Sequence, residues 1–262
     1  MPEPTFCAQR STSNNTFTIT DELRRQVEEK QYVITRSDSF KMTEAGQIAF
    51  NQLQNSWKHL ERDSFYGEKD PTCYRLRRYT NFDFNPRTGE LCLQTHVPYV
   101  QSQEMNRYVG GKIRHFGDLL ADTYENPFFQ DLVTYDFSLF PVEEEFLDHL
   151  WTCQVHMIRI VVGANQSTPV TPEGIHSDGY PFAGVHLINK NNVEGGQSTV
   201  YAYDEKPLAT LTFENPLDSL WFEDRNLKHY VTPISSTNGE SGHRDILAIS
   251  FSLPNSSYTT HI

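Results

Sequence analysis

Three residues in the second half of the chain are of types that bind metal ions. His176 and Asp178 stand two residues apart behind a Pro-Glu-Gly turn in TPEGIHSDGY, and His229 follows far downstream in KHYVTPI. On an extended strand, side chains two residues apart point to the same face, so the first pair would present an imidazole and a carboxylate together. Taken alone, the pair fits half of a metal site, a catalytic acid and base, or a surface accident.

His229 supplies the third ligand that a metal site needs. In an antiparallel barrel, strands that are distant in sequence lie side by side, which would bring His229 to His176 and Asp178. Two neutral imidazoles and one carboxylate leave the opposite side of an ion open, an arrangement suited to non-haem Fe(II) and oxygen. We therefore predict that these three residues are metal ligands and catalytic. The alternative is that each is a solvated loop residue or, for His229, a hydrogen-bonded core histidine.

Arg244 stands at the start of the mainly apolar run HRDILAISFSL. A guanidinium does not lose its proton, so burying it is costly unless an anion pairs with it. A planar donor at this place suits bidentate binding of a carboxylate-bearing co-substrate. The alternative is a surface salt bridge with Asp245 or a nearby glutamate, which would contribute little to stability.

Four motifs, TPEGIHSDG, NNVEGGQSTVY, KHYVTPI and HRDILAISFSL, follow one another along the chain. In order and spacing they resemble the bacterial Fe(II)/2-oxoglutarate dioxygenases that hydroxylate free L-amino acids, of the isoleucine 4-hydroxylase type. The resemblance covers roughly Tyr74 to Leu253. It implies a jelly-roll fold with His176, Asp178 and His229 as iron ligands. It also implies that Arg244 binds the distal carboxylate of 2-oxoglutarate.

The same resemblance implies the cofactors and the reaction. Fe(2+), 2-oxoglutarate and O2 would be required, with ascorbate as an activator. An unactivated C–H bond would be hydroxylated while 2-oxoglutarate is decarboxylated to succinate and CO2. In related halogenases a small residue replaces the carboxylate ligand so that chloride can bind, so Asp178 favours hydroxylation. Isoleucine, leucine, methionine and similar amino acids are the expected substrates, because the resembling enzymes accept them.

A free amino acid needs partners for its carboxylate and its ammonium group near the iron. Arg159, which projects from an otherwise apolar run, is the candidate for the carboxylate, and Glu173 or Asp204 for the ammonium group. Tyr180 and Ser198 are further candidates for substrate binding. Each has a plain alternative: Arg159 would face solvent or pair structurally, and Glu173 would cap the turn before the metal-binding segment.

The elements that must position these residues are mostly short strands. From Gln154 onward, seven β-rich runs separated by polar turns favour a sandwich or barrel over βαβ units. They are QVHMIRIVVGA, FAGVHLIN, QSTVYAY, LATLTF, DSLWF, HYVTPI and DILAISFSL. Upstream, YRLRRYTNFDF and ELCLQTHVPYV predict strands, and PVEEEFLDHLWT predicts a short helix. Two earlier helices are predicted in TDELRRQVEEKQY and TEAGQIAFNQLQNSWKHLERD.

The expected fold is therefore mainly β (α+β): a double-stranded β-helix (jelly roll, cupin-like) with flanking N-terminal helices packed against one face. Residues 1–17 are polar and without periodicity, and predict a flexible N-terminal tail. No repeat or low-complexity linker divides the remainder. We expect residues 18–262 to form a single dioxygenase domain with its jelly-roll core at about 74–254.

Charge and cysteine usage limit the partners and the compartment. Acidic residues outnumber basic ones, 34 against 22, which gives a formal charge of -12. Nucleic acid and anionic membranes are therefore not expected partners, and no signal peptide or membrane span is expected. Cys7, Cys73, Cys92 and Cys153 are scattered without a CxxC pair, which indicates a reduced, cytoplasmic protein. An acidic surface is compatible with a monomer or a homodimer.

Two other functions stay open at this point. The same iron chemistry on a peptide, a protein side chain or an amino-acid-derived natural product would need an open groove, whereas a free amino acid needs a closed pocket with paired charges. A non-catalytic cupin-type metal-binding sensor would have no use for a buried Arg244.

Overall fold

A large antiparallel sheet forms the centre of the computed structural model, which describes residues 7–8, 15–19, 22–67 and 74–260. Its long strands are β6 (Tyr74–Phe84), β8 (Trp151–Val162), β17 (Gly242–Ser252) and β10 (Phe182–Asn191). The shorter ones are β1 (Cys7–Ala8), β7 (Leu91–Leu93), β14 (Ser219–Phe222), β3 (Tyr32–Thr35) and β5 (Glu61–Arg62). The strand order is β1-β7-β6-β8-β17-β10-β14-β3, with β5 on β6. Strands far apart in sequence thus become neighbours.

Smaller antiparallel sheets complete the β structure. One has the order β13-β12-β15, and another the order β11-β16-β9. Their strands are β12 (Gln197–Ala202), β13 (Pro207–Thr212), β15 (Leu227–Val231), β11 (Val193–Gly195), β16 (Ile234–Ser236) and β9 (Ser167–Thr168). A two-stranded sheet of β2 (Phe17–Ile19) and β4 (Phe40–Met42) lies near the N-terminus. The predicted mainly β jelly roll with flanking helices is confirmed.

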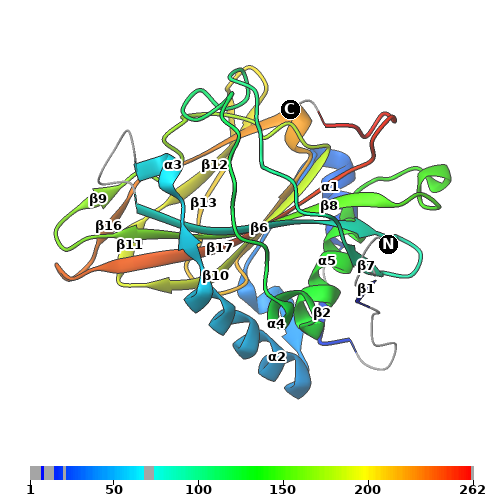
Figure 1. Ribbon diagram of the computed structural model, residues 1–262, viewed down its shortest axis with the longest axis horizontal. Helices are drawn as coiled ribbons and strands as arrows, with labels where there is room; N and C mark the ends of the chain where they lie inside the picture. Colours follow the sequence, from blue (N-terminus) through cyan, green and yellow to red (C-terminus); the bar gives the residue numbers. More distant parts are fainter. Residues whose placement is uncertain (1–6, 9–14, 20–21, 68–73, 261–262) are drawn as a thin grey trace.

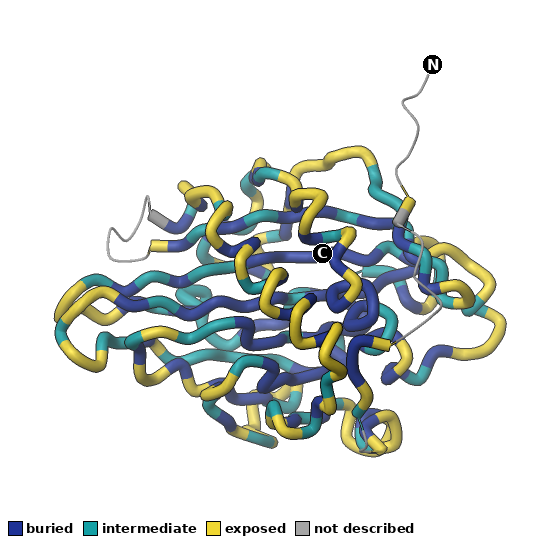
Figure 2. The backbone as a smooth tube through the Cα atoms, turned by 90° about the horizontal axis from the view of Figure 1, so that it is seen from below, coloured by how far each residue is buried: buried dark blue, intermediate teal, exposed yellow. Residues whose placement is uncertain are grey.

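Helices α1 (Leu23–Lys30), α2 (Glu44–Asn55), α4 (Ala121–Tyr124) and α5 (Pro127–Leu139) lie on one face of the large sheet (Figure 1). The short helix α3 (Ser64–Gly67) lies apart from them, beside β6. The short 3-10 turns are η1 (Ser37–Ser39), η2 (Ser56–His59), η3 (Glu144–Phe146) and η4 (Asp224–Asn226). Buried side chains of α2 and α5 pack on those of β6, β8 and β17 to form the main hydrophobic core. Figure 2 shows this pattern, with the long strands mostly buried and the outer turns of the helices exposed.

Side-chain alternation gives β17 two different faces. Leu247, Ile249 and Phe251 point into the main core, whereas Arg244, Ile246 and Ala248 line a pocket on the opposite face. β8 behaves in the same way, since Cys153, Val155 and Met157 join the core and Ile158 and Ile160 line the pocket. The large sheet therefore separates the core from the pocket.

Most of the elements predicted from sequence are present. The two N-terminal helices, the strand YRLRRYTNFDF and the seven strands of the second half are confirmed. ELCLQTHVPYV forms only β7, and PVEEEFLDHLWT contains only the turn η3 before β8 begins at Trp151. TPEGIHSDGY is not a strand: it begins with a turn in which Gly174 N–H donates to Thr171 O at 3.0 Å, and it pairs with β15 only through His176.

The predicted flexible tail lies mostly outside the described residues. In its described part, Cys7 and Ala8 pair with β7, and Thr16 donates two hydrogen bonds to Asp131, at 2.7 Å from N–H and 2.8 Å from the hydroxyl. Phe17 is 5% exposed and packs in the main core. The prediction is wrong for Thr16 and Phe17, because the polar residues that precede Phe17 in the sequence give no sign that its ring is buried.

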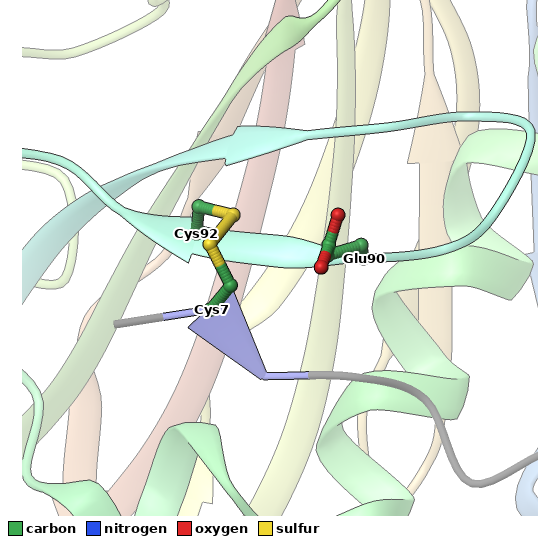
Figure 3. Close-up of side chains that lie close together, drawn as sticks. All are labelled: Cys7, Glu90 and Cys92. Atoms are coloured by element: carbon green, nitrogen blue, oxygen red, sulfur yellow. A yellow bond between two sulfur atoms is a disulfide. The ribbon is translucent and has the colours of Figure 1, made fainter. Parts of the chain in front are cut away.

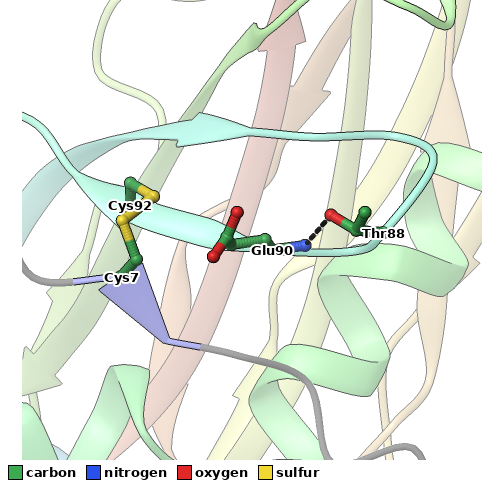
Figure 4. The surroundings of a disulfide bond; sticks show 4 residues. All are labelled: Cys7, Thr88, Glu90 and Cys92. Carbon is green, nitrogen blue, oxygen red and sulfur yellow. Dashed lines mark hydrogen bonds between the residues drawn. A yellow bond between two sulfur atoms is a disulfide. The ribbon is translucent and has the colours of Figure 1, made fainter.

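The prediction of reduced cysteines is wrong for Cys7 and Cys92, which form a disulfide between β1 and β7 (Figure 3). The two are far apart in sequence, so their spacing gives no sign of the pairing. Glu90 lies beside the disulfide and donates its backbone N–H to Thr88 Oγ1 at 3.2 Å (Figure 4). Because the two sulfur atoms are bonded to each other, this group presents no thiolate to a metal. Cys153 is free and buried, and Cys73 lies outside the described residues.

Candidate active site

His176, Asp178 and His229 lie together at one wall of the pocket. Asp178 Oδ1 is 3.9 Å from His176 Nε2, and Asp178 Oδ2 is 3.8 Å from His229 Nε2. One potential ligand atom from each residue falls within 4.8 Å of the others. The two rings are 4.2 Å apart at their centres. Two imidazoles and a carboxylate at these distances could hold one metal ion.

The histidines are held with their Nε2 atoms toward this cluster. His176 Nδ1 lies 2.9 Å from Gly174 O, so an Nδ1–H donated to that carbonyl leaves Nε2 free to bind a metal. His229 Nδ1 lies 3.6 Å from Asp224 Oδ1. Burial opposes protonation of His229, but the carboxylates of Asp224 and Asp178 outweigh it and raise the pKa of the imidazole.

Asp224 also fixes the backbone of the segment that carries Asp178. Its carboxylate accepts from Asp178 N–H at 3.1 Å and from Tyr180 N–H at 3.0 Å, and its carbonyl accepts from Ser177 Oγ at 2.8 Å. One fully buried carboxylate therefore positions an irregular segment that no ladder of strand hydrogen bonds supports.

Gln101 contacts the Asp178 side chain directly. Its Nε2 donates to Asp178 Oδ1 at 3.0 Å, and its Oε1 accepts from Arg114 Nη2 at 2.7 Å and from Asn106 Nδ2 at 3.2 Å. Burial opposes ionisation of Asp178, but the two histidines and this hydrogen bond outweigh it and hold the pKa of the carboxyl below its ordinary value. Gln101 lies in the long connection between β7 and α4, and nothing in the sequence pattern marks it.

Arg244 lies in the same pocket and is 3% exposed. It makes no hydrogen bond or ion pair with any residue that the structure describes, and its guanidinium lies 5.4 Å from the centre of the Phe213 ring. Burial lowers the pKa of its side chain to about 10. The alternative of a surface salt bridge is wrong, because Asp245 pairs with Arg159 instead. A buried cation without an anion is suited to binding one.

The substrate-binding candidates divide into two groups. Glu173 and Ser198 line the pocket. Arg159 does not: it lies on the core side of β8, and its Nε and Nη2 donate to the two carboxylate oxygens of Asp245 at 2.6 Å and 2.7 Å. Its prediction as a carboxylate partner is wrong, because strand register turns it away from the pocket.

Tyr180 and Asp204 are also outside the pocket wall. The Tyr180 hydroxyl donates to Gln154 Oε1, and its ring is buried. Asp204 lies in the exposed turn between β12 and β13, where it accepts from Lys206 N–H at 3.3 Å. Sequence reasoning missed several polar residues of the wall, which are Tyr66, Arg75, Arg77, Tyr99, Gln101 and Asn106.

His186 belongs to a separate buried network behind the pocket. Its Nε2 lies 2.9 Å from Asp136 Oδ2 and its Nδ1 lies 2.9 Å from Ser219 Oγ, while Trp221 Nε1 donates to Asp136 Oδ1 at 2.6 Å. All four residues are fully buried. This serine, histidine and aspartate are the residue types of a nucleophilic triad. Because they are buried in the core, they instead form a hydrogen-bond network that links α5 to the sheet.

The sequence model described as "2OG-Fe dioxygenase" matches residues 54–250. The chain therefore belongs to the 2OG-Fe dioxygenase family, whose members are oxidoreductases that use Fe(2+), 2-oxoglutarate and O2. It is 26% identical over 239 residues to an L-isoleucine-4-hydroxylase of Bacillus thuringiensis, with 90% of this chain and 96% of that protein covered.

Solved structures of related proteins share the fold. The crystal structure of IDO from Bacillus thuringiensis matches with a TM-score of 0.73 at 20% identity, covering 91% of this chain and 98% of that one. A bsmA homolog from Methylobium petroleophilum matches with a TM-score of 0.69 at 24% identity, covering 87% and 91%. The Fe(II)/(alpha)ketoglutarate-dependent dioxygenase TqaL gives 0.66 at 15% identity, covering 92% and 91%. Across the described ranges, no helix is long and apolar enough to cross a membrane.

Proposed function

We propose that this dioxygenase hydroxylates an unactivated C–H bond of a free L-amino acid, with isoleucine, leucine and methionine as the first candidates. The observation that carries the proposal is one pocket in which the cluster of His176, Asp178 and His229 shares its walls with an unpaired arginine and a buried glutamate. The relative named L-isoleucine-4-hydroxylase, which matches over 90% of the chain, supports the choice of substrate class.

In this proposal His176, Asp178 and His229 hold Fe(2+), and Arg244 binds the distal carboxylate of 2-oxoglutarate. The donor set and the buried guanidinium without an anion fit these two groups. When bound, iron and 2-oxoglutarate supply the activation of O2, with succinate and CO2 as co-products. The protein's own residues bind and orient the reactants and keep water away from the reacting carbon.

Glu173 is the proposed partner of the substrate ammonium group. Its side chain is 6% exposed, Oε1 lies 3.6 Å from His176 Nε2, and Oε2 has no hydrogen-bond partner among the described residues. A buried carboxylate oxygen without a donor is suited to a cation that arrives with the substrate. Ser198, on β12, offers a hydroxyl to the same pocket.

The test is an assay of succinate and of product mass with Fe(II), ascorbate, 2-oxoglutarate and oxygen against a panel of free L-amino acids. The expected result is a product heavier by one oxygen atom, formed in step with succinate and lost when a chelator is present. If iron is retained but none of the free amino acids gives coupled turnover, a peptide or a modified amino acid becomes the expected substrate. Bound iron with no 2-oxoglutarate turnover on any substrate would favour a metal-binding sensor.

We also infer that residues 18–262 form one domain in the cytoplasm, as a monomer or a homodimer. The main core supports a single domain, because it joins helix residues such as Leu23 to Tyr258 near the C-terminus. A requirement for Fe(II) and 2-oxoglutarate supports the cytoplasm, whereas the Cys7–Cys92 disulfide is typical of oxidising compartments. Thiol titration of freshly isolated protein decides between them, since a reduced pair in cells favours the cytoplasm.

A further inference from the structure

Arg77 is a second buried arginine in the wall of the pocket. It lies on β6, is 6% exposed, and makes no hydrogen bond to any described residue. Its one ion pair within the described chain joins Nη1 to Asp63 Oδ2 at 4.0 Å, and neither Nε nor Nη1 has a hydrogen-bond partner. The guanidinium lies 4.9 Å from the centre of the Phe116 ring and 5.3 Å from that of Tyr99. Hydrogen bonds between ions are far shorter, about 2.8 Å, so Asp63 leaves this cation able to bind another anion.

The pocket thus offers cations on two different strands. Arg77 on β6 pairs in register with Ile158 of β8, and Arg244 on β17 pairs with Ile160 of the same strand. Both isoleucines line the pocket, so the two arginines enter it from opposite sides of β8. If Arg244 binds the co-substrate, Arg77 remains for a second carboxylate.

Other buried arginines strengthen the positive field around Arg77. Arg75 stands two residues earlier on the same face of β6, and Arg114 is fully buried close by. Burial lowers the pKa of His156, and the charges of Arg77 and Arg114 lower it further. Arg77 and Arg114 thus act on the same buried groups, and this positive charge favours an anionic group beside Arg77.

Glu173 brings a negative charge to the same region. Burial raises the pKa of Tyr66, Glu173 raises it further, and Arg75 and Arg77 oppose the rise. Tyr66 therefore lies within the field of both the carboxylate and the arginines, and it lines the pocket with them. A carboxylate and a guanidinium in the wall of one pocket match the two charged groups of a zwitterion.

We propose that Arg77 binds the α-carboxylate of the substrate, so that the enzyme selects free α-amino acids over those whose carboxyl group is in an amide or peptide bond. This inference rests on the proposed function and adds to it the residue that recognises the free acid. An amide carries no charge to set against the guanidinium. The expected preference for the acid is roughly 10- to 100-fold, which is the contribution of one charged hydrogen bond.

The test is calorimetric titration of the Fe(II)- and 2-oxoglutarate-loaded protein, without oxygen, with L-isoleucine and with L-isoleucinamide. The wild type is expected to bind the acid more tightly than the amide by that factor. Arg77→Met is expected to bind both at the level of the amide, while the visible absorption of the iron complex with 2-oxoglutarate stays unchanged. Asp63→Asn is the matched control: it removes the ion pair but keeps Arg77, so the preference for the acid is expected to persist.

Two results overturn the inference: a preference for the acid that survives in Arg77→Met, or one that Asp63→Asn abolishes to the same extent. In either case coupled hydroxylation by the wild type leaves the proposed function standing. If Arg77→Met does not fold, Arg77→Gln decides, because it keeps a polar side chain but not the charge; an undiminished preference there also overturns the inference. If the wild type neither binds nor turns over any free amino acid, the proposed function itself is overturned.

Discussion

The backbones of His176 and His229 exchange two hydrogen bonds, His176 N–H to His229 O at 3.1 Å and His229 N–H to His176 O at 2.7 Å. This isolated antiparallel bridge connects an irregular segment to the strand β15. Residues directly opposite each other in such a bridge have their side chains close together, so the backbone itself sets the spacing of the two imidazoles. Changing either side chain leaves the bridge in place.

His176→Ala and Asp178→Ala are therefore expected to abolish iron retention and turnover without unfolding the protein. The free energy of unfolding of the iron-free protein should stay within about 1 kcal/mol of the wild type, since each variant loses a side-chain hydrogen bond but none between backbone groups. Iron content after desalting and succinate formation measure the effect. His115→Ala, at an exposed histidine, is the control. Succinate production at the wild-type level in either variant would exclude these ligands.

Arg244→Ala is expected to spare iron and to raise the concentration of 2-oxoglutarate required for half-maximal turnover. Removing one partner of a buried charge pair costs about 2–5 kcal/mol, which corresponds to roughly 30-fold or more in affinity. A titration with 2-oxoglutarate measures it, with Arg87→Ala as the control because Arg87 is exposed. An unchanged titration curve would remove Arg244 from the co-substrate site.

Gln101→Leu is expected to weaken iron binding by roughly 10- to 100-fold, the usual effect of losing a hydrogen bond that orients a metal ligand. The Nε2 hydrogen bond to Asp178 is lost, and so is the acceptor of Arg114, which lowers the free energy of unfolding by about 1–3 kcal/mol. Competition with a metal indicator measures the first effect, and urea unfolding the second. Gln103→Leu, at a nearby exposed glutamine, should change neither.

Iron binding is expected to weaken as the pH falls, because a proton on His229 competes with the metal. Burial opposes this protonation, but Asp224 and Asp178 outweigh it and raise the pKa of His229 above 6.5, so the competition begins at a higher pH than for an ordinary imidazole. Asp224→Asn removes one of the raising charges and should move the midpoint of iron release to lower pH. Metal titrations between pH 5.5 and 8 test this, within about the range in which histidine titrates. A midpoint that stays fixed or rises would contradict the assignment.

The strands could be predicted from short-range patterns, and the cluster of His176, Asp178 and His229 from the order and spacing of motifs that resemble those of a known family. Period-two alternation marks β8 and β17, and the spacing of the motifs marks the histidines and Arg244. α5 could not be predicted in this way, since most of its residues are buried and its sequence shows no polar stripe. Burial on every side removes the periodicity by which an amphipathic helix is found.

The sequence also does not show which of its arginines lie in the pocket. Arg159 and Arg77 both stand in predicted strands. Arg159 pairs with Asp245 in the sheet, whereas Arg77 lines the pocket. Which face each occupies depends on the register between strands far apart in the chain, and a shift of one residue reverses it. Gln101 and Arg114 lie in a long irregular connection, where no period relates position to direction.

The two-sided character of β17 bears on how this enzyme can diverge. Its even-numbered residues Ile246 and Ala248 line the pocket, and its odd-numbered residues Leu247 and Ile249 pack in the main core that joins the helices to the sheet. Exchanges at the even positions alter the volume offered to a substrate side chain and leave the helix-facing layer intact. Selection for a new amino acid substrate, in nature or in a laboratory library, can therefore change every second residue of β17 while the residues that stabilise the fold stay the same.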